Sequence, residues 1–216
     1  MVSRASGSDR LTVGDDHDLA ARRAGIVSAL LRLGRAIDGL LRDGAGPLRL
    51  TPAQAEALRF AGRIRPDMAT VGQLARVLGV RHATAVGILG PLIDRGLIER
   101  RPHPFDGRQR VLALTPEGAR LLARLTSLTV SLETTLDELE PRTLAQLELG
   151  LGALVAGLQR SGALVVAAPC AGCVHFQPDA DPGSPRPHRC ALLQRFLADA
   201  EARMDCPEHV AGTVPA

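Results

Sequence analysis

The sequence contains no lysine, no tryptophan and no tyrosine, and all four cysteines lie in the last quarter of the chain. All 26 basic residues are therefore arginine, so the choice of Arg over Lys is not itself an argument for a function. No run approaches the roughly 18 uninterrupted apolar residues of a membrane span, and the N-terminus lacks the basic and then apolar order of a signal peptide. We therefore expect a cytoplasmic protein without a membrane partner, in which structural disulfides are not expected.

Motifs of catalysis are also missing. The sequence has no nucleotide-binding glycine motif, no Ser/His/Asp arrangement and no paired acidic site, and its scattered Asp and Glu fit solvated helix faces. We do not expect an enzyme. With 45% apolar and 23% charged residues over 216 positions, the composition is that of a globular protein with one substantial core and an appendage.

Residues 70–116 have the pattern of a winged helix-turn-helix. A short helix is predicted to begin at Thr70, a good N-cap, and to stop at Gly79. A second helix is predicted to open at Arg81 and to close at Gly96. Two short helices joined by a turn that contains Gly form a helix-turn-helix, whose second helix enters the major groove of DNA with its N-terminal residues on base edges.

A basic hairpin is predicted next. Two β-prone runs, 97–101 and 110–114, flank a loop with the turn signal Asp106-Gly107. A narrow minor groove attracts inserted Arg, so we interpret this Arg-rich hairpin as the wing.

Residues 59–110 hold ten Arg against four acids, whereas residues 111–216 hold eight Arg against twelve acids, so positive charge is concentrated on the predicted DNA-binding lobe. The alternative is a protein-interaction module with an Arg-rich surface. The predicted DNA-binding residues are Thr70, Gln73, Arg81, His82, Thr84, Arg100, Arg101, Asp106, Arg108 and Arg110.

The segment LIDRGLIERR, followed by HPFDGRQRVLALTPEG, resembles the MarR family of bacterial transcription regulators. The likeness covers about residues 20–160 and includes the Asp-x-Arg wing tip and the Leu-Thr-x-x-Gly start of the next helix. The resemblance implies that Arg108 reaches into the minor groove and that Asp106 holds the wing by pairing with a nearby Arg.

The predicted recognition helix departs from a regular helical sequence at Gly87, Gly90 and Pro91. In a helix interior Gly costs about 1 kcal/mol and Pro about 3 kcal/mol relative to Ala. We therefore expect a kink near Gly90. The base-reading side chains are then reduced to Arg81, His82 and Thr84.

Leucine at helical spacing predicts three further helices, over residues 19–41, from Thr115 to Leu139, and from Pro141 onward. These helices contain more Leu side chains than the small DNA-binding lobe alone could bury. The resemblance implies that they form a dimerisation domain, and a two-fold homodimer would place two recognition helices about one turn apart on a pseudo-palindromic operator in double-stranded DNA. The alternative is an intramolecular bundle that buries the same leucines.

The cysteine spacing is C-x2-C-x16-C-x15-C, formed by Cys170, Cys173, Cys190 and Cys206. Such a short, Pro-rich and polar segment cannot fold on a core alone, and four cysteines within it predict a thiolate-ligated metal centre. Zinc binding supplies about 10–16 kcal/mol of apparent folding free energy in small modules, so a metal would provide the missing stability.

The spacing of the candidate ligands indicates which metal the site would bind. Structural zinc usually takes two Cys-x-x-Cys or Cys/His knuckles, and here there is one knuckle with two solitary cysteines. Iron-sulfur clusters commonly take scattered cysteines, and the spacing is similar to that of high-potential iron-sulfur proteins, although aromatic residues are sparse. We predict an iron-sulfur cluster, with zinc as the alternative; redox thiols or disulfides stay open. His175, His188 and His209 are candidate ligands or hydrogen-bond donors to a ligand.

The sequence thus predicts a mainly α protein: a winged helix-turn-helix with a helical dimerisation domain and a small Cys-rich metal-binding tail. Its predicted function is that of a dimeric repressor whose operator binding responds to the iron-sulfur centre through the helix before the tail. One alternative is a regulator with structural zinc and a small-molecule inducer, and another is a redox enzyme that uses the Cys-rich centre. The predicted domains are a disordered arm (1–17), a dimerisation helix with the DNA-binding domain (18–114), a helical dimerisation region (115–161) and the Cys-rich extension (162–216).

Overall fold

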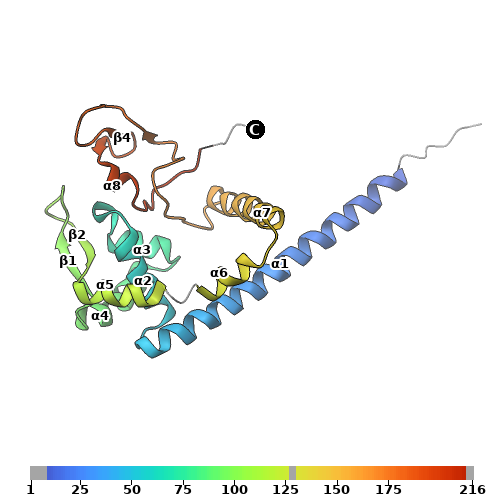
Figure 1. Cartoon of the computed structure of the whole chain (residues 1–216), viewed down its shortest axis with the longest axis horizontal. Helices are drawn as coiled ribbons and strands as arrows, with labels where there is room; N and C mark the ends of the chain where they lie inside the picture. Colours follow the sequence, from blue (N-terminus) through green and yellow to red (C-terminus); the bar gives the residue numbers. More distant parts are fainter. Residues whose placement is uncertain (1–8, 127–129, 213–216) are drawn as a thin grey trace, which may run out of the picture.

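The computed structural model describes residues 9–126 and 130–212, which form a mainly helical chain with two small antiparallel sheets (Figure 1). The elements are α1 (Asp9–Ala45), η1 (Gly46–Leu48), α2 (Pro52–Arg63), η2 (Pro66–Met68), α3 (Val71–Val77), α4 (His82–Asp94), β1 (Ile98–Pro102), β2 (Arg110–Leu114), α5 (Pro116–Thr126), α6 (Val130–Asp137), α7 (Pro141–Arg160), β3 (Phe176–Gln177), β4 (His188–Cys190), β5 (Arg195–Leu197) and α8 (Asp199–Ala202).

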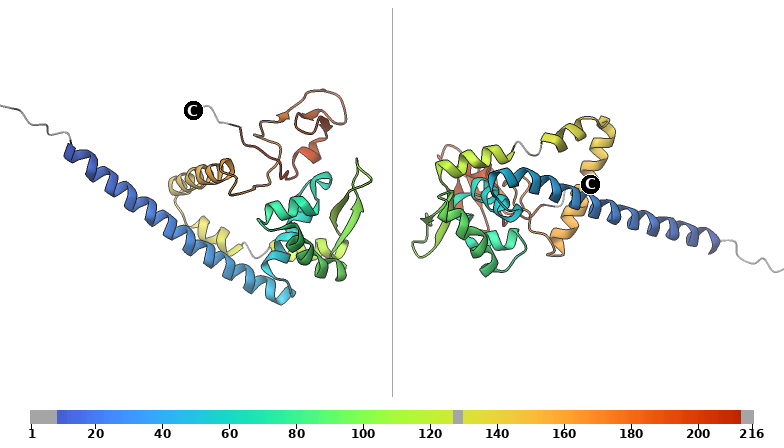
Figure 2. Two further views of the ribbon diagram at one scale, coloured as in Figure 1. Left: turned by 180° about the vertical axis from the view of Figure 1, so that it is seen from behind. Right: turned by 90° about the horizontal axis from the view of Figure 1, so that it is seen from below.

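The long helix α1 starts at Asp9, earlier than the predicted end of the arm at residue 17, and residues 1–8 lie outside the described part of the chain. We call the segment from α2 to α5 the winged unit. Figure 2 shows α1 as a long rod whose C-terminal end lies at this unit. Apolar side chains along it stay exposed, among them Ile26 (59%) and Leu31 (61%). The helix therefore offers an apolar surface that its own chain does not cover.

The helix-turn-helix begins and ends where the sequence predicts. The Thr70 hydroxyl accepts a hydrogen bond from the Gln73 backbone N–H (3.2 Å) and so caps α3. Gly79 takes a left-handed conformation (φ +64°), which ends this helix, and Gly96 does the same after α4 (φ +63°). Helix α4 runs from His82 to Asp94 with Pro91 inside it, so the proline does not divide the helix into two.

The wing is the hairpin β1–β2, paired from Ile98 opposite Leu114 to Pro102 opposite Arg110. Its inner residues join the core of the winged unit. The fully buried side chains of this core include Leu58, Leu74, Leu89, Leu92, Ile98, Leu112 and Leu125. The wing therefore projects from a packed base, and its rim stays in solvent.

Helix α5 lies close against the wing because of Gly118. The Gly118 backbone N–H donates to the Thr115 hydroxyl (3.0 Å), which caps the helix. A Cβ atom at position 118 would lie 2.0 Å from the Leu97 carbonyl oxygen. Such a distance is far inside van der Waals contact, so this close approach requires glycine.

The single helix predicted from Thr115 to Leu139 is described as α5 and α6, and residues 127–129 between them lie outside the described part. The predicted helix from Pro141 is α7, which buries none of its side chains. Its apolar stripe remains about two-fifths exposed and consists of Leu144, Leu147, Leu151, Leu154 and Leu158. Among the described residues, α7 therefore does not form the intramolecular bundle that the sequence left open.

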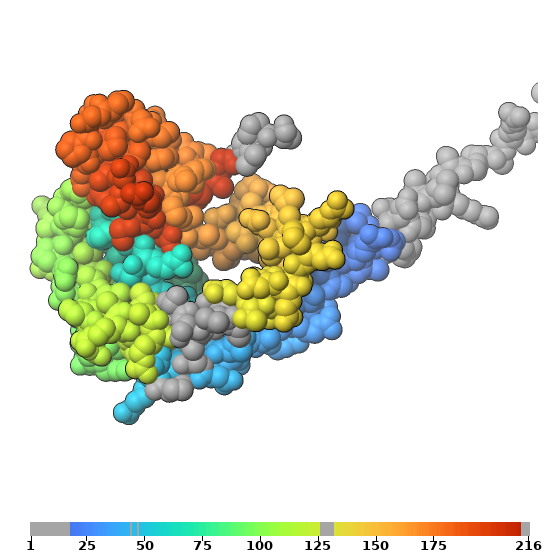
Figure 3. Space-filling view, viewed as in Figure 1, coloured from blue at the N-terminus to red at the C-terminus, as the bar shows by residue number. Residues whose placement is uncertain are grey.

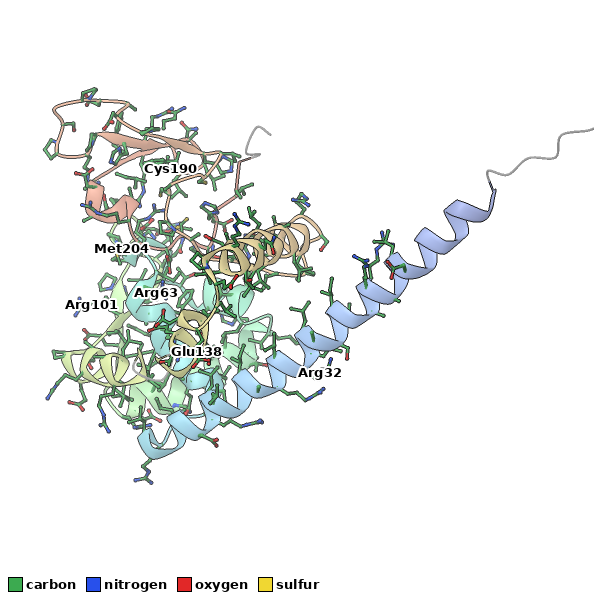
Figure 4. The ribbon with its side chains drawn as sticks, turned by 45° about the vertical axis from the view of Figure 1, so that its right-hand side comes forward. Arg32, Arg63, Arg101, Glu138, Cys190 and Met204 are labelled. Atoms are coloured by element: carbon green, nitrogen blue, oxygen red, sulfur yellow. The ribbon has the colours of Figure 1, made fainter. Side chains whose placement is uncertain are left out.

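The Cys-rich tail folds as the three-stranded sheet β3–β4–β5 followed by α8. Figure 3 shows the orange and red tail lying directly against the winged unit. The two parts are joined by backbone hydrogen bonds, since Arg65 N–H donates to the Asp205 carbonyl (2.9 Å) and Asp205 N–H to the Arg63 carbonyl (3.1 Å). Figure 4 shows Met204 of the tail next to Arg63 at the end of α2. The tail is therefore docked on the segment that precedes α3.

No single helix within the described residues is long and apolar enough to cross a membrane; α3 and α4, whose axes differ by 108°, reach that length and composition only as a bent pair.

Candidate nucleic-acid interface and cysteine cavity

The predicted base-reading residues lie together at the start of α4. Arg81 is the N-cap residue, and the side chains of Arg81, His82 and Thr84 are all exposed. The opposite face of α4 holds the helix in the core through Ala85 and Leu89. This arrangement leaves the N-terminal turn of the helix free to meet the edges of bases in a major groove.

The four predicted wing arginines are exposed as well: Arg100 and Arg101 on β1, Arg108 in the loop and Arg110 at the start of β2. Of these four residues, Arg101 pairs with an acid: its Nε donates to a Glu99 carboxylate oxygen at 2.8 Å. Exposed ion pairs of this kind contribute little free energy and are readily exchanged. The wing therefore presents its positive charge to solvent, as contact with phosphates requires.

Asp106 holds the tip of the wing, and the nearby Arg that it contacts is Arg108, through the backbone N–H of that residue. Its carboxylate accepts hydrogen bonds from the Arg108 backbone N–H (3.0 Å) and from the Gln109 side-chain amide (2.8 Å). These two hydrogen bonds lower the pKa of Asp106. The carboxylate thus fixes the loop through its backbone and leaves the side chain of Arg108 exposed.

Two predicted DNA-binding residues on α3 have other partners in this structure. Thr70 caps the helix, and the Gln73 side-chain amide donates to the Glu208 carboxylate of the tail (2.7 Å), which also pairs with Arg76. Burial alone would raise the pKa of Glu208, but the hydrogen bonds from Gln73 and Arg76 bring it below its ordinary value. Gln73 therefore lies at the junction with the tail.

All four cysteines line one small cavity, whose volume of about 10 Å³ is roughly that of a single water molecule. Cys170, Cys190 and Cys206 are buried, Cys173 is half-buried, and all four are free thiols. In a tetrahedral site with metal–sulfur bonds of about 2.3 Å, the ligand sulfurs would lie only about 3.8 Å apart. Among the described residues, no three His, Cys, Asp or Glu side chains are placed to hold a single metal ion. The thiols share a space but do not close on one point.

Arg65 enters this cavity from the winged unit, and its side chain is fully buried. Its guanidinium donates to the sulfurs of Cys170 (3.8 Å) and Cys206 (3.9 Å). Burial raises the pKa of both thiols, and the charge of Arg65 opposes that effect. Burial disfavours the charge of Arg65 too, yet Asp67 and the two thiols raise its pKa above the ordinary value. The cavity therefore contains a permanent cation that faces sulfur.

The three candidate histidines divide into two groups. His175 and His209 line the cysteine cavity, and the buried Nε2 of His209 has no hydrogen-bond partner among the described residues. His188 does not line it: its Nε2 lies 2.7 Å from Asp199, and its Nδ1 accepts from the Asp179 backbone N–H (3.2 Å). Both nitrogens of His188 are thus engaged elsewhere, so it is not placed as a ligand.

An exposed recognition helix beside an Arg-rimmed wing defines a winged-helix DNA-binding protein. Comparison with known proteins shows the family to which this chain belongs. The sequence profile described as the MarR family matches residues 50–109, and an HTH-type transcriptional regulator of Mycobacterium tuberculosis is 33% identical over 107 residues, which cover 49% of this chain and 70% of that protein. The chain belongs to the MarR family of transcription regulators.

Two solved structures have the same fold. The transcriptional regulator PA3341 is 26% identical with a TM-score of 0.56, and the match covers 62% of this chain and 98% of that one. CouR from Rhodococcus jostii, bound to p-coumaroyl-CoA, is 23% identical with a TM-score of 0.51, and the match covers 60% of this chain and 90% of that one. The fold is thus that of MarR-type transcription regulators.

Proposed function

We propose that this MarR-family regulator is a repressor that binds a pseudo-palindromic operator as a homodimer, and that a metal centre on its four cysteines sets its operator affinity. One observation carries the proposal: all four cysteines face a single cavity that lies against the winged unit. A centre at this place would lie against Arg65, in the segment that joins α2 to α3.

Dimerisation is supported by the apolar stripes that α1 and α7 leave exposed. Leu144, Leu147, Leu151, Leu154 and Leu158 follow each other at spacings of three and four residues, so they lie on one face of α7. A second copy of the chain would cover this face and, by two-fold symmetry, set the two α4 helices on successive half-sites.

The donor set favours an iron-sulfur cluster over zinc. Four Cys are the usual ligands of such clusters, whose cysteines are commonly scattered in sequence. Structural zinc usually takes two knuckles, whereas this tail has the one knuckle of Cys170 and Cys173 with two solitary cysteines. All four cysteines, which line one cavity, would hold the cluster. His175 and His209 then serve as hydrogen-bond donors to ligand sulfur.

The chain's own residues prepare the cavity for such a group. Arg65 supplies positive charge and two N–H donors to the sulfurs of Cys170 and Cys206, and both features stabilise thiolate ligands. Phe176 and Leu193 close the cavity with apolar surface. When bound, a cluster would supply a reversible change of charge, which Arg65 would sense directly.

The first experiment is metal and acid-labile sulfide analysis with a visible spectrum, on full-length protein purified without oxygen. Iron with sulfide and a brown colour supports the cluster. One zinc per chain in a colourless protein contradicts it and makes the tail a structural clip. Protein without bound metal would overturn the metal centre altogether.

DNA binding is tested with a duplex that the protein selects from a random-sequence pool. Arg108→Ala should weaken binding and reduce the slope of log affinity against log salt by about 1, because one cation is lost from the phosphate contacts. The control Arg120→Ala removes an exposed Arg of α5 that pairs with Glu117 on the same helix, and it should leave the slope unchanged. An Arg108 variant with wild-type slope would refute the wing assignment.

A second candidate function is induction by a small molecule, with zinc in the tail. It is favoured by an open pocket of about 630 Å³ between the end of α7 and the tail, within the range of ligand sites. Arg76 and Arg160 lie at this pocket beside Leu164 and Val165, which suits an anion with an apolar body. CouR, which has the same fold, is bound to p-coumaroyl-CoA in its solved structure. A colourless, redox-insensitive protein whose DNA binding responds to such ligands would establish this candidate.

A further inference from the structure

The proposed centre and the wing are linked by a continuous set of contacts, through residues that the DNA-binding function does not use. We propose that Arg65, Asp67, His103 and Arg195 couple the cysteine cavity to the tip of the wing, so that the state of the centre sets the position of the wing. This inference rests on the proposed function and specifies how the centre acts on DNA binding.

The first link runs from sulfur to Asp67. The Arg65 guanidinium faces the sulfurs of Cys170 and Cys206 with its two terminal nitrogens. Its Nε donates to the Asp67 carboxylate at 2.8 Å. The Arg65 and Asp67 side chains are only 1% and 7% exposed, so water cannot screen this pair or replace either partner. A displacement of Arg65 must therefore move Asp67 or leave a charge unpaired.

The second link runs from Asp67 to the wing through His103. The His103 Nδ1 accepts hydrogen bonds from the backbone N–H groups of Phe105 (3.1 Å) and Asp106 (3.0 Å). The ring proton therefore lies on Nε2, which donates to the Asp67 carbonyl at 2.8 Å. One imidazole thus holds the turn of the wing and ties it to the backbone of Asp67.

Arg195 of the tail makes a parallel link. Its Nη2 lies 2.6 Å from the second carboxylate oxygen of Asp67, and its guanidinium carbon lies 4.5 Å from the centre of the Phe105 ring. Its Nε and Nη1 are buried and have no hydrogen-bond partner among the described residues. Arg195 is therefore held by Asp67 and by the wing together, and it would follow either one if they moved.

These contacts join two sites through a compact polar cluster in which each member has few alternative partners. Coupling of this kind changes affinity by roughly 5- to 150-fold in proteins. The wing carries Arg108, whose side chain would enter the narrow minor groove of DNA. A small shift of the wing tip would therefore alter this contact. Arg195 and Phe105 are positioning residues here, since they act on the DNA contact through the wing.

The test compares the metal-loaded full-length protein with the same preparation after chelator extraction, on the selected DNA duplex. The measured quantity is the ratio of the two affinities, which we expect to be at least about 5-fold for the wild type. Arg195→Gln and Phe105→Ala each cut the link through Arg195 and should each lower this ratio by a similar factor, and the double variant should equal either single one. Metal content and visible spectrum should stay at the wild-type level. Phe105 is 58% exposed, so its variant keeps the fold.

The matched control is Arg186→Gln, which removes an Arg of the same tail that pairs with Glu201 inside the tail. It should keep the full wild-type ratio. A second readout is amide hydrogen exchange of residues 103–109 without DNA, which metal extraction should accelerate more in the wild type than in Arg195→Gln. If both wing-side variants keep the wild-type ratio, the coupling route is wrong while the proposed function stands. A wild-type ratio of one overturns the proposed function itself.

Discussion

Asp67 is the acidic residue on which the junction of tail and winged unit depends. Its carboxylate lies between two guanidinium groups, 2.8 Å from Arg65 and 2.6 Å from Arg195, whose side chains are 1% and 17% exposed. Asp67→Asn keeps the shape and removes the negative charge. Removing one partner of a buried ion pair costs about 3–5 kcal/mol, because the remaining charge stays buried without compensation. We expect a loss of unfolding free energy in this range.

The assay is urea unfolding followed by circular dichroism, at one fixed protein concentration because a dimer is more stable at higher concentration. The control is Glu117→Gln, which breaks a surface pair with Arg120 whose side chains are 59% and 73% exposed. Surface pairs contribute about 0–1 kcal/mol, so this variant should behave like the wild type. A loss below about 1 kcal/mol for Asp67→Asn would refute the view that this cluster is a dry, charge-balanced junction.

Three further outcomes follow from the fold. Gly118→Ala should cost about 1–3 kcal/mol in urea unfolding because a Cβ there meets backbone, whereas Gly87→Ala, with open space around it, should be neutral or slightly stabilising. Leu147→Glu should shift sedimentation toward the monomer, and Leu149→Glu should not, because Leu149 is 76% exposed and lies outside the apolar stripe; equal effects would contradict the assigned interface. Cys206→Ser should lower metal content and change affinity for the selected duplex while sedimentation stays that of the wild type; unchanged DNA binding with lost metal would make the centre purely structural.

Local signals made the winged unit predictable. The cap at Thr70, the turn glycine Gly79 and the wing pairing of residues 97–101 with 110–114 depend on neighbours in sequence, and the structure confirms them with small shifts of the ends. The role of Asp106 in holding the wing was predicted with a nearby Arg as its partner. Arg108 is that partner, although it donates its backbone N–H, and the side-chain amide of Gln109 donates as well.

The position of the tail could not be predicted from local pattern. Arg65 meets Cys170 and Cys206 across 105 and 141 residues of sequence, and neither a period nor a motif marks such a pair. A lone Arg-x-Asp in a connecting loop looks like ordinary solvated surface. The signal that could have drawn attention to Arg65 was the demand of four thiolates for nearby positive charge. The four arginines within the Cys-rich extension could equally have met this demand.

The docking of the tail changes how a centre there would act. From the order of the chain, the helix before the tail was the expected route, because it connects directly to the dimerisation region. In the structure Cys206 packs into the same hydrophobic core as Leu58 and Leu74, while α7 buries no side chain of its own. A structural change at the cysteines would therefore act first on the packed core beneath α3 and the wing. Only after that would it reach the exposed helices α1 and α7. A change at the centre would then act first on how each winged unit fits its half-site, and only secondarily on the distance between half-sites.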